Sequence, residues 1–196
     1  MTITAIAYPL LALTCLLTGS VPAQTITADA SPRVAVTFTG GYETDPRDGG
    51  RPVVLIAAAL NVPSEVFRKA FTGVIPARGG QAPEPEQVRR NKRALMSSLG
   101  PYGVTNELLD RVTTYYRYNR SQGEMWRNTP AAAYATVRDG VVTFTITNPG
   151  CGYSSPPKVS VAGMGDLKVT DLKVTATLSF GADLARNGSI KEITAK

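Results

Sequence analysis

Histidine is absent from all 196 residues of this sequence. Because histidine is the commonest general base and metal ligand in proteins, its absence excludes the Ser-His-Asp triad, Cys-His pairs and nearly every zinc site. Cysteine is almost as scarce, with Cys15 and Cys151 as its two occurrences. Cys151 lies in a Pro-Gly-Cys-Gly turn with no histidine to activate it, so we predict that it is structural or incidental rather than a nucleophile.

Long apolar runs are also missing, apart from one near the N-terminus. Residues 1–23 have the features of a signal peptide, with an apolar run from Ala5 to Leu17 and a small residue, Ala23, at the expected cleavage point, although no Lys or Arg precedes the run. The run is shorter than the roughly 20 residues that span a bilayer. We therefore expect a secreted, periplasmic or cell-envelope protein without a transmembrane segment in its mature chain. Removal of Cys15 with the leader would leave no partner for a disulfide.

The leader carries no charge, so the net charge of +6 belongs to the mature chain. This charge favours an acidic partner, such as an acidic envelope polymer or protein, and export argues against intracellular nucleic acid. The alternative is that the positive charge only keeps an exported protein soluble.

Residues 24–130 are predicted to be mainly helical, with about four helices after a possible strand at Val34–Thr39. The loop Tyr42–Gly50 carries acids that suggest calcium, but Arg47 occupies the third ligand position of an EF-hand and no Glu stands at the twelfth. We therefore predict no metal site and no cofactor. The first helix is apolar all round, which is typical of a buried helix. The helices are expected over residues 53–60, 63–73, about 84–99 and from 105 to about 122.

The fourth helix belongs to a segment, Gly103–Trp126, that is rich in aromatic residues and arginine. Thr105 is its predicted N-cap, because a threonine hydroxyl can accept a hydrogen bond from a first-turn N–H. Flat aromatic faces beside forked cationic donors suit sugars with acidic groups or acidic peptide segments. The alternative is that the aromatic side chains are buried and only seal the joint between the two halves of the protein. The candidate ligand-binding residues are Tyr116, Arg117, Tyr118, Arg120, Trp126 and Arg127.

Residues 131–196 are predicted to form a small antiparallel β-meander, which makes the fold α+β. Asp139-Gly140 between two alternating runs is a strong hairpin signal, and Asn187-Gly188 is expected to be a second hairpin turn. The sequence DLKVT occurs twice in succession over 166–175. Five is an odd number, so the two copies would present their apolar residues to opposite faces of one strand, and we predict a turn or bulge near 170 and 171.

The residues TNPGCGYSSPPKVSV at 147–161, followed by NGSI at 187–190, resemble a β-repeat found in many exported bacterial and phage structural proteins. The helical half, with YGVTN at 102–106 and YYRY at 115–118, is similar to uncharacterised exported bacterial proteins. The resemblance implies a structural module and implies no catalytic residues.

The leading hypothesis is an exported, non-catalytic structural or interaction protein. One alternative is a glycan-cleaving enzyme with an acid pair drawn from Glu107, Asp110 and Glu124. Another is a polyanion-binding protein that uses the basic residues of 89–93 and 117–127, for which binding would depend steeply on salt.

Overall fold

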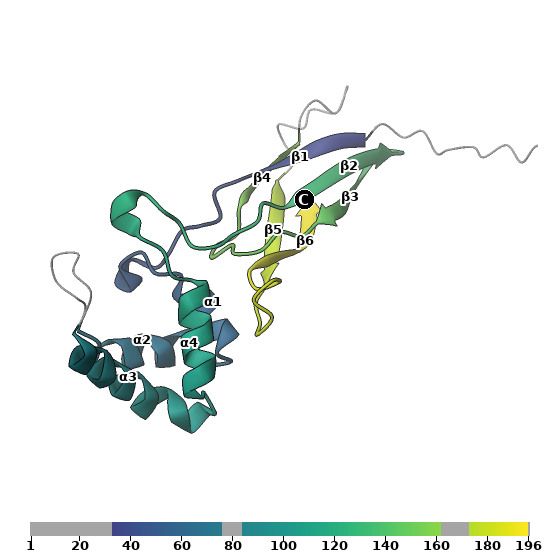
Figure 1. The fold of residues 1–196 in the computed structure, drawn as a ribbon. Helices are drawn as coiled ribbons and strands as arrows, with labels where there is room; N and C mark the ends of the chain where they lie inside the picture. Colours follow the sequence, from purple (N-terminus) through teal and green to yellow (C-terminus); the bar gives the residue numbers. More distant parts are fainter. Residues whose placement is uncertain (1–32, 76–83, 162–172, 196) are drawn as a thin grey trace, which may run out of the picture. The chain divides into compact units, whose positions relative to one another are not determined.

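The computed structural model describes residues 33–75, 84–161 and 173–195, all within one compact unit, Ser31–Lys196. Among these residues a first strand, β1, is followed by four α-helices and then by five further strands, all in antiparallel sheets (Figure 1). The predicted α+β fold, with helices followed by antiparallel strands, is confirmed. Within the described residues, no helix is long and apolar enough to cross a membrane.

The helices lie where the apolar patterns predict them. They are α1 (Val53–Ala59), α2 (Ser64–Phe71), α3 (Pro85–Leu99) and α4 (Asn106–Tyr115). Helix α1 is almost entirely buried, as its continuous apolar sequence predicts. The turn from α1 to α2 passes through Asn61 at φ 55°, a left-handed conformation that Asn adopts more readily than most residues. Side chains from all four helices meet in one core, which includes Leu55, Phe67, Leu99 and Val112.

Helix α4 begins as predicted and ends earlier than predicted. The Thr105 side chain accepts a hydrogen bond of 3.2 Å from the Leu108 N–H, which confirms it as the N-cap. The α-helix stops at Tyr115 instead of continuing to about 122. Beyond it, Asn119 is extended and its side-chain oxygen accepts from the Ser121 N–H, so a side chain replaces the helical bond. A short 3-10 turn, η3 (Arg120–Gln122), follows and ends at Gly123.

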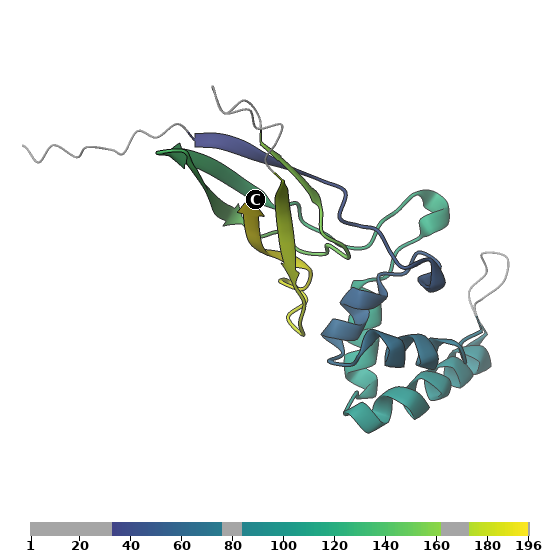
Figure 2. The same ribbon diagram turned by 180° about the vertical axis from the view of Figure 1, so that it is seen from behind.

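The main sheet has the strand order β3-β2-β1-β4 (Figure 2). Strand β1 lies between β2 and β4, so the N-terminal strand is an inner strand of the sheet. Its Val36 pairs with Ala133 on one side and with Val161 on the other. A second sheet pairs β5 with β6. The bounds are β1 (Arg33–Thr39), β2 (Ala132–Arg138), β3 (Val141–Asn148), β4 (Lys158–Val161), β5 (Val174–Ser179) and β6 (Ser189–Ala195).

The hairpin between β2 and β3 turns at Asp139 and Gly140, as predicted. Both residues have positive φ, 51° and 77°, which is the requirement of the hairpin turn whose twist matches the flanking strands. Strand β5 falls within the alternating run expected there, with Ala176 buried and its neighbours Thr175 and Thr177 exposed. Most of the tandem DLKVT sequence lies outside the described residues, so the predicted turn near 170 stays a prediction.

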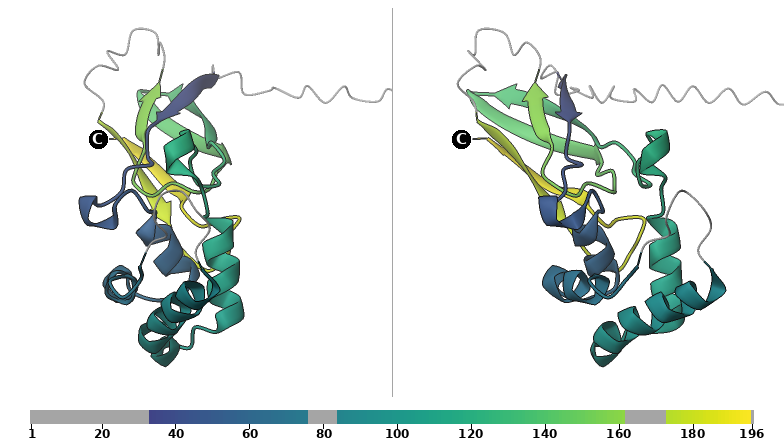
Figure 3. Two further views of the ribbon diagram at one scale, coloured as in Figure 1. Left: turned by 60° about the vertical axis from the view of Figure 1, so that its left-hand side comes forward. Right: turned by 90° about the vertical axis from the view of Figure 1, so that its left-hand side faces the viewer.

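The expected two-residue hairpin at Asn187-Gly188 is not formed. Strands β5 and β6 are joined by a longer connection, residues 180–188, which reaches toward α1 and α4 (Figure 3). Asn187 is 1% exposed. Its side-chain amide donates to the Leu55 carbonyl at 2.7 Å and to the Tyr116 hydroxyl at 2.9 Å, and its oxygen accepts from the Gly181 N–H at 3.1 Å. Asn187 therefore lies buried between the strands and the helices and connects them through its side-chain hydrogen bonds.

The two pieces of the repeat-like sequence pair with each other. Gly152 donates its N–H to Asn187 at 2.8 Å, Tyr153 to Gly188 at 3.0 Å, and Ile190 to Pro149 at 2.8 Å. Gly188 has φ 69°, and an added Cβ there would collide with the Tyr153 carbonyl oxygen. Glycine is therefore required at 188 both for its conformation and for the close approach of the two segments.

Candidate functional site

The loop Tyr42–Arg51, between β1 and α1, is the centre of the candidate site. Two hollows described below border it, and side chains from several elements hold its backbone. Tyr118 donates its hydroxyl hydrogen to the Gly50 carbonyl, and Arg120 donates from Nη1 to the Gly49 carbonyl at 3.1 Å. The loop is thus fixed from the segment that follows α4.

Two of the three predicted aromatic residues, Tyr118 and Trp126, form a packed chain with Tyr42 of this loop. Tyr118 meets Trp126 edge-on at 5.6 Å between ring centroids, and Trp126 meets Tyr42 at 6.3 Å. Tyr42 then stacks on Tyr153 at 5.1 Å. Trp126 is 4% exposed and its indole N–H donates to Gly152 at 2.8 Å. Trp126 therefore packs between the helices and the strands. This is the alternative in which the aromatic side chains are buried at the joint and do not bind a ligand.

The six predicted site residues do not gather at one place. Tyr118, Arg120 and Trp126 border one hollow of about 210 Å³, together with Tyr42 and Met125. Tyr116 is instead buried, 3% exposed, against Asn187. Burial raises the pKa of the Tyr116 hydroxyl above its usual value.

The two remaining predicted arginines, Arg117 and Arg127, are exposed and lie outside this hollow. The Arg127 guanidinium lies 4.8 Å from the centre of the Tyr115 ring. The Arg117 side chain makes no hydrogen bond or ion pair with the described residues. Neither side chain belongs to the hollow at Tyr118.

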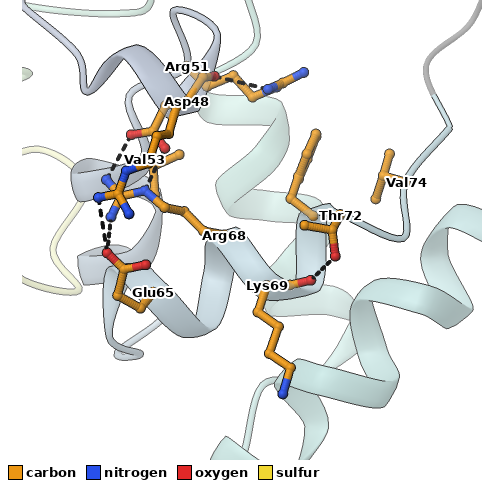
Figure 4. Close-up of a pocket in the computed structure, with 10 residues that line it drawn as sticks. Asp48, Arg51, Val53, Glu65, Arg68, Lys69, Thr72 and Val74 are labelled. Atoms are coloured by element: carbon orange, nitrogen blue, oxygen red, sulfur yellow. Dashed lines mark hydrogen bonds and ion pairs between the residues drawn. The ribbon is translucent and has the colours of Figure 1, made fainter.

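A second, larger hollow was not predicted: a groove of about 580 Å³ between the loop and helix α2 (Figure 4). Its volume falls within the range of about 300–1,000 Å³ that is usual for ligand pockets. Four cationic, two acidic and four other side chains line it. They are Arg47, Asp48, Arg51, Val53, Glu65, Arg68, Lys69, Phe71, Thr72 and Val74.

One end of the groove consists of mutually paired charges. Arg68 donates from Nε and Nη2 to the two carboxylate oxygens of Asp48 at 2.6 and 2.9 Å, and from Nη1 to Glu65 at 2.6 Å. Asp48 is buried, so this fork is the arrangement that keeps its charge satisfied. The Asp48 contacts raise the pKa of Arg68 further above its usual range. Arg47 is held by Asp45, and these hydrogen bonds lower the pKa of Asp45 to about 2.

The other end of the groove combines one open cation with apolar side chains. The Arg51 guanidinium lies 4.3 Å from the centre of the Phe71 ring, and its Nη1 donates to the Asp48 backbone carbonyl at 2.9 Å. No carboxylate of the described residues lies within ion-pair distance of Arg51. Lys69 likewise has no ion pair with any described residue, but Figure 4 shows its ammonium group pointing away from the Asp48–Arg68 pair. Arg51 is therefore the cation that is placed to receive an acidic ligand in the groove.

The acids of the enzyme hypothesis lie outside this groove. Asp110 binds Lys92 at 2.7 Å, and Glu124 accepts the Asn119 N–H at 2.7 Å. Hydrogen bonds from the first turn of α4 lower the pKa of Glu107. A catalytic general acid requires the opposite shift, so this arrangement does not favour acid catalysis by Glu107.

The basic run on α3 is partly neutralised along the helix. Glu86 accepts hydrogen bonds from Arg89 at 2.8 Å and from Arg93 at 3.4 Å, and Lys92 is held by Asp110. Arg90 is exposed and forms no ion pair within contact distance in the described part of the chain. The surface that remains is less cationic than the sequence alone indicates.

The described residues contain no cluster of three or more Asp, Glu or Cys side chains that could hold a metal ion.

Sequence analysis missed the groove because its essential pairing joins Asp48 to Arg68, which are 20 residues apart. The one available signal was the acid-rich Asp45–Asp48 turn followed, one helix later, by Arg68-Lys69. No family model, curated protein or solved structure matches the chain.

Proposed function

We propose that this protein is an exported, non-catalytic interaction protein that binds an acidic segment of a partner protein, with the strands as its scaffold. Arg51 carries the proposal, since it borders a 580 Å³ groove and has no carboxylate partner among the described residues. A charged hydrogen bond to such a donor contributes about 1.5–3 kcal/mol. The predicted signal peptide and the resemblance to exported proteins support the assignment to the cell envelope or the medium.

The groove supports this function better than polyanion binding. Arg47 and Arg68 already hold Asp45, Asp48 and Glu65, so most of the positive charge in the groove is compensated. A polyanion requires many open cations in a row, whereas one open guanidinium suits a ligand with one well-placed carboxylate.

The test is a binding titration with labelled decapeptides of Gly and Ser that carry either two Glu or two Lys residues. We expect the acidic peptide to bind, and its affinity to fall only moderately between low and physiological salt, because few charges take part. Equal binding of the acidic and basic peptides, or no binding of either, would contradict the proposal. Heparin serves as the polyanion probe. Heparin binding that is tight, steeply salt-dependent and stronger than that of the acidic peptide would favour the polyanion hypothesis instead.

A further inference from the structure

We infer that the groove recognises a peptide segment in which a carboxylate residue is directly followed or preceded by a bulky apolar residue. This inference rests on the proposed function and narrows its ligand. It depends on the division of the groove into a paired, polar end and an end where one cation lies against apolar side chains.

The first step concerns the carboxylate. Arg68 is paired with Asp48 and Glu65, and Arg47 is paired with Asp45, so the positive charge of each is already compensated by a carboxylate. The Arg51 guanidinium uses one N–H on the Asp48 carbonyl, and its other N–H groups have no hydrogen-bond partner among the described residues. Because a guanidinium has five donors in a planar fork, Arg51 can still hold a carboxylate.

The second step concerns the apolar residue. The Arg51 guanidinium lies over the Phe71 ring, and Val53 and Val74 line the same groove. Phe71 and Val74 are half-buried, so both present apolar surface to the groove. A carboxylate held by Arg51 would therefore lie directly beside apolar surface. An apolar side chain next to that carboxylate would be removed from water at the same time, which adds affinity.

The third step distinguishes a peptide from a small apolar acid. The groove borders α2 from Glu65 to Phe71, a helical distance of about 9 Å at 1.5 Å per residue, and continues to Val74. That length accommodates about three extended residues. A peptide backbone also brings N–H donors, and the Glu65 carboxylate, 68% exposed at the rim, can accept from them. A small apolar acid has no N–H to offer to this carboxylate.

The experiment uses three decapeptides of Gly and Ser that differ at two central positions: Phe-Glu, Ser-Glu and Phe-Gln. Binding to the protein is followed by NMR shifts of backbone amides. We expect the Phe-Glu peptide to bind about tenfold more tightly than either analogue, because one loses the apolar burial and the other the charged hydrogen bond. If Phe-Glu and Phe-Gln bind equally, the proposed function fails. If Phe-Glu and Ser-Glu bind equally and better than Phe-Gln, acidic binding stands and this inference alone is overturned.

Two variants with the same change of charge locate the site. Arg51→Gln should weaken binding of the Phe-Glu peptide about tenfold and abolish its preference over Phe-Gln. Arg90→Gln, which removes an exposed cation of α3 that does not line the groove, should change affinity less than twofold. Equal losses in both variants would mean diffuse attraction and overturn the inference. Arg51→Lys keeps the charge without the fork, and should lose affinity while the thermal midpoint stays near that of the wild type.

A final measurement distinguishes a peptide from a small aromatic acid, since both can supply a carboxylate beside an apolar group. 3-Phenylpropionate carries a carboxylate and a ring without a peptide backbone. We expect it to bind more weakly than the Phe-Glu peptide by about tenfold, because it cannot donate to Glu65. Binding of 3-phenylpropionate as tight as that of the peptide would overturn the assignment to a peptide.

Discussion

Removal of the Asn187 side chain should weaken the protein more than any surface change, because this amide joins the strands to the helices. It forms hydrogen bonds with Leu55, Tyr116 and Gly181 at 2.7–3.1 Å in a buried position. Asn187→Ala removes all three bonds and leaves polar groups in a site that water does not reach. Each bond contributes about 0.5–1.5 kcal/mol, and an abandoned buried group costs about 1–3 kcal/mol. We therefore expect a loss of about 2–4 kcal/mol in the free energy of unfolding.

Asn187→Asp tests the chemistry of this site at nearly constant volume. An ionised carboxylate has no N–H for the Leu55 carbonyl, and burial disfavours its charge, so its pKa should lie above the unfolded value of about 3.9. A pKa raised by folding contributes stability below the unfolded pKa that is lost as the pH rises through the folded pKa. The variant should therefore be destabilised, relative to the wild type, more at pH 8 than at pH 4.

Urea unfolding followed by tryptophan fluorescence measures these changes directly. Trp126 is the single tryptophan, and it is buried beside Gly152, which itself pairs with Asn187. Tyr116→Phe is the matched control, because it removes one hydrogen bond of the three and should cost about 1 kcal/mol. A loss below about 1 kcal/mol in Asn187→Ala, or equal destabilisation of Asn187→Asp at both pH values, would refute the reasoning.

Two further predictions concern the same joint. Gly188→Ala should destabilise the protein more than Gly140→Ala in urea unfolding, because both residues have positive φ but only Gly188 lies against another segment, at the Tyr153 carbonyl. Equal losses would show that backbone conformation alone accounts for the glycine. The pKa of the Tyr42 hydroxyl is raised to about 12, mainly because the side chain is partly buried and secondly because Tyr153 lies beside it. A pKa raised by folding stabilises the protein below the unfolded pKa of about 10 and loses that contribution as the pH approaches 12. In a tyrosinate absorbance titration, Tyr42→Phe should remove a component near pH 12, and removal of one near pH 10 instead would contradict the packing of Tyr42 on Tyr153.

The features that could be predicted from sequence depend on neighbouring residues. Thr105 caps α4 through a bond to Leu108, and Asp139-Gly140 sets the hairpin by its own backbone angles. The burial of α1 follows from a sequence that is apolar on every side. In each case the deciding interaction spans a few residues, so the local pattern is sufficient.

The features that could not be predicted depend on distant partners. Asn187-Gly188 has the sequence of a hairpin turn, but bonds to Leu55 and Tyr116, far away in the sequence, decide its conformation. The aromatic segment after α4 was a reasonable candidate site, yet Trp126 is engaged by Gly152 and Tyr118 by Gly50. The groove could not be predicted because the sequence does not show which arginines form ion pairs. In the folded protein Arg68 and Arg47 pair with carboxylates, and Arg51 is left without one among the described residues.

The position of β1 between β2 and β4 affects the order in which the protein can fold. Its partners in the sheet lie roughly 100 residues further along the chain. The helices need only near neighbours, whereas one edge of β1 stays unpaired until β2 is available and the other edge until β4 is available. Closing such long loops costs entropy before any pairing is gained, so this sheet should form late and in one cooperative step. Until both partners are in place, the open edge of β1 can pair with a wrong strand or with another chain, so this short segment is exposed to mispairing before the fold is complete.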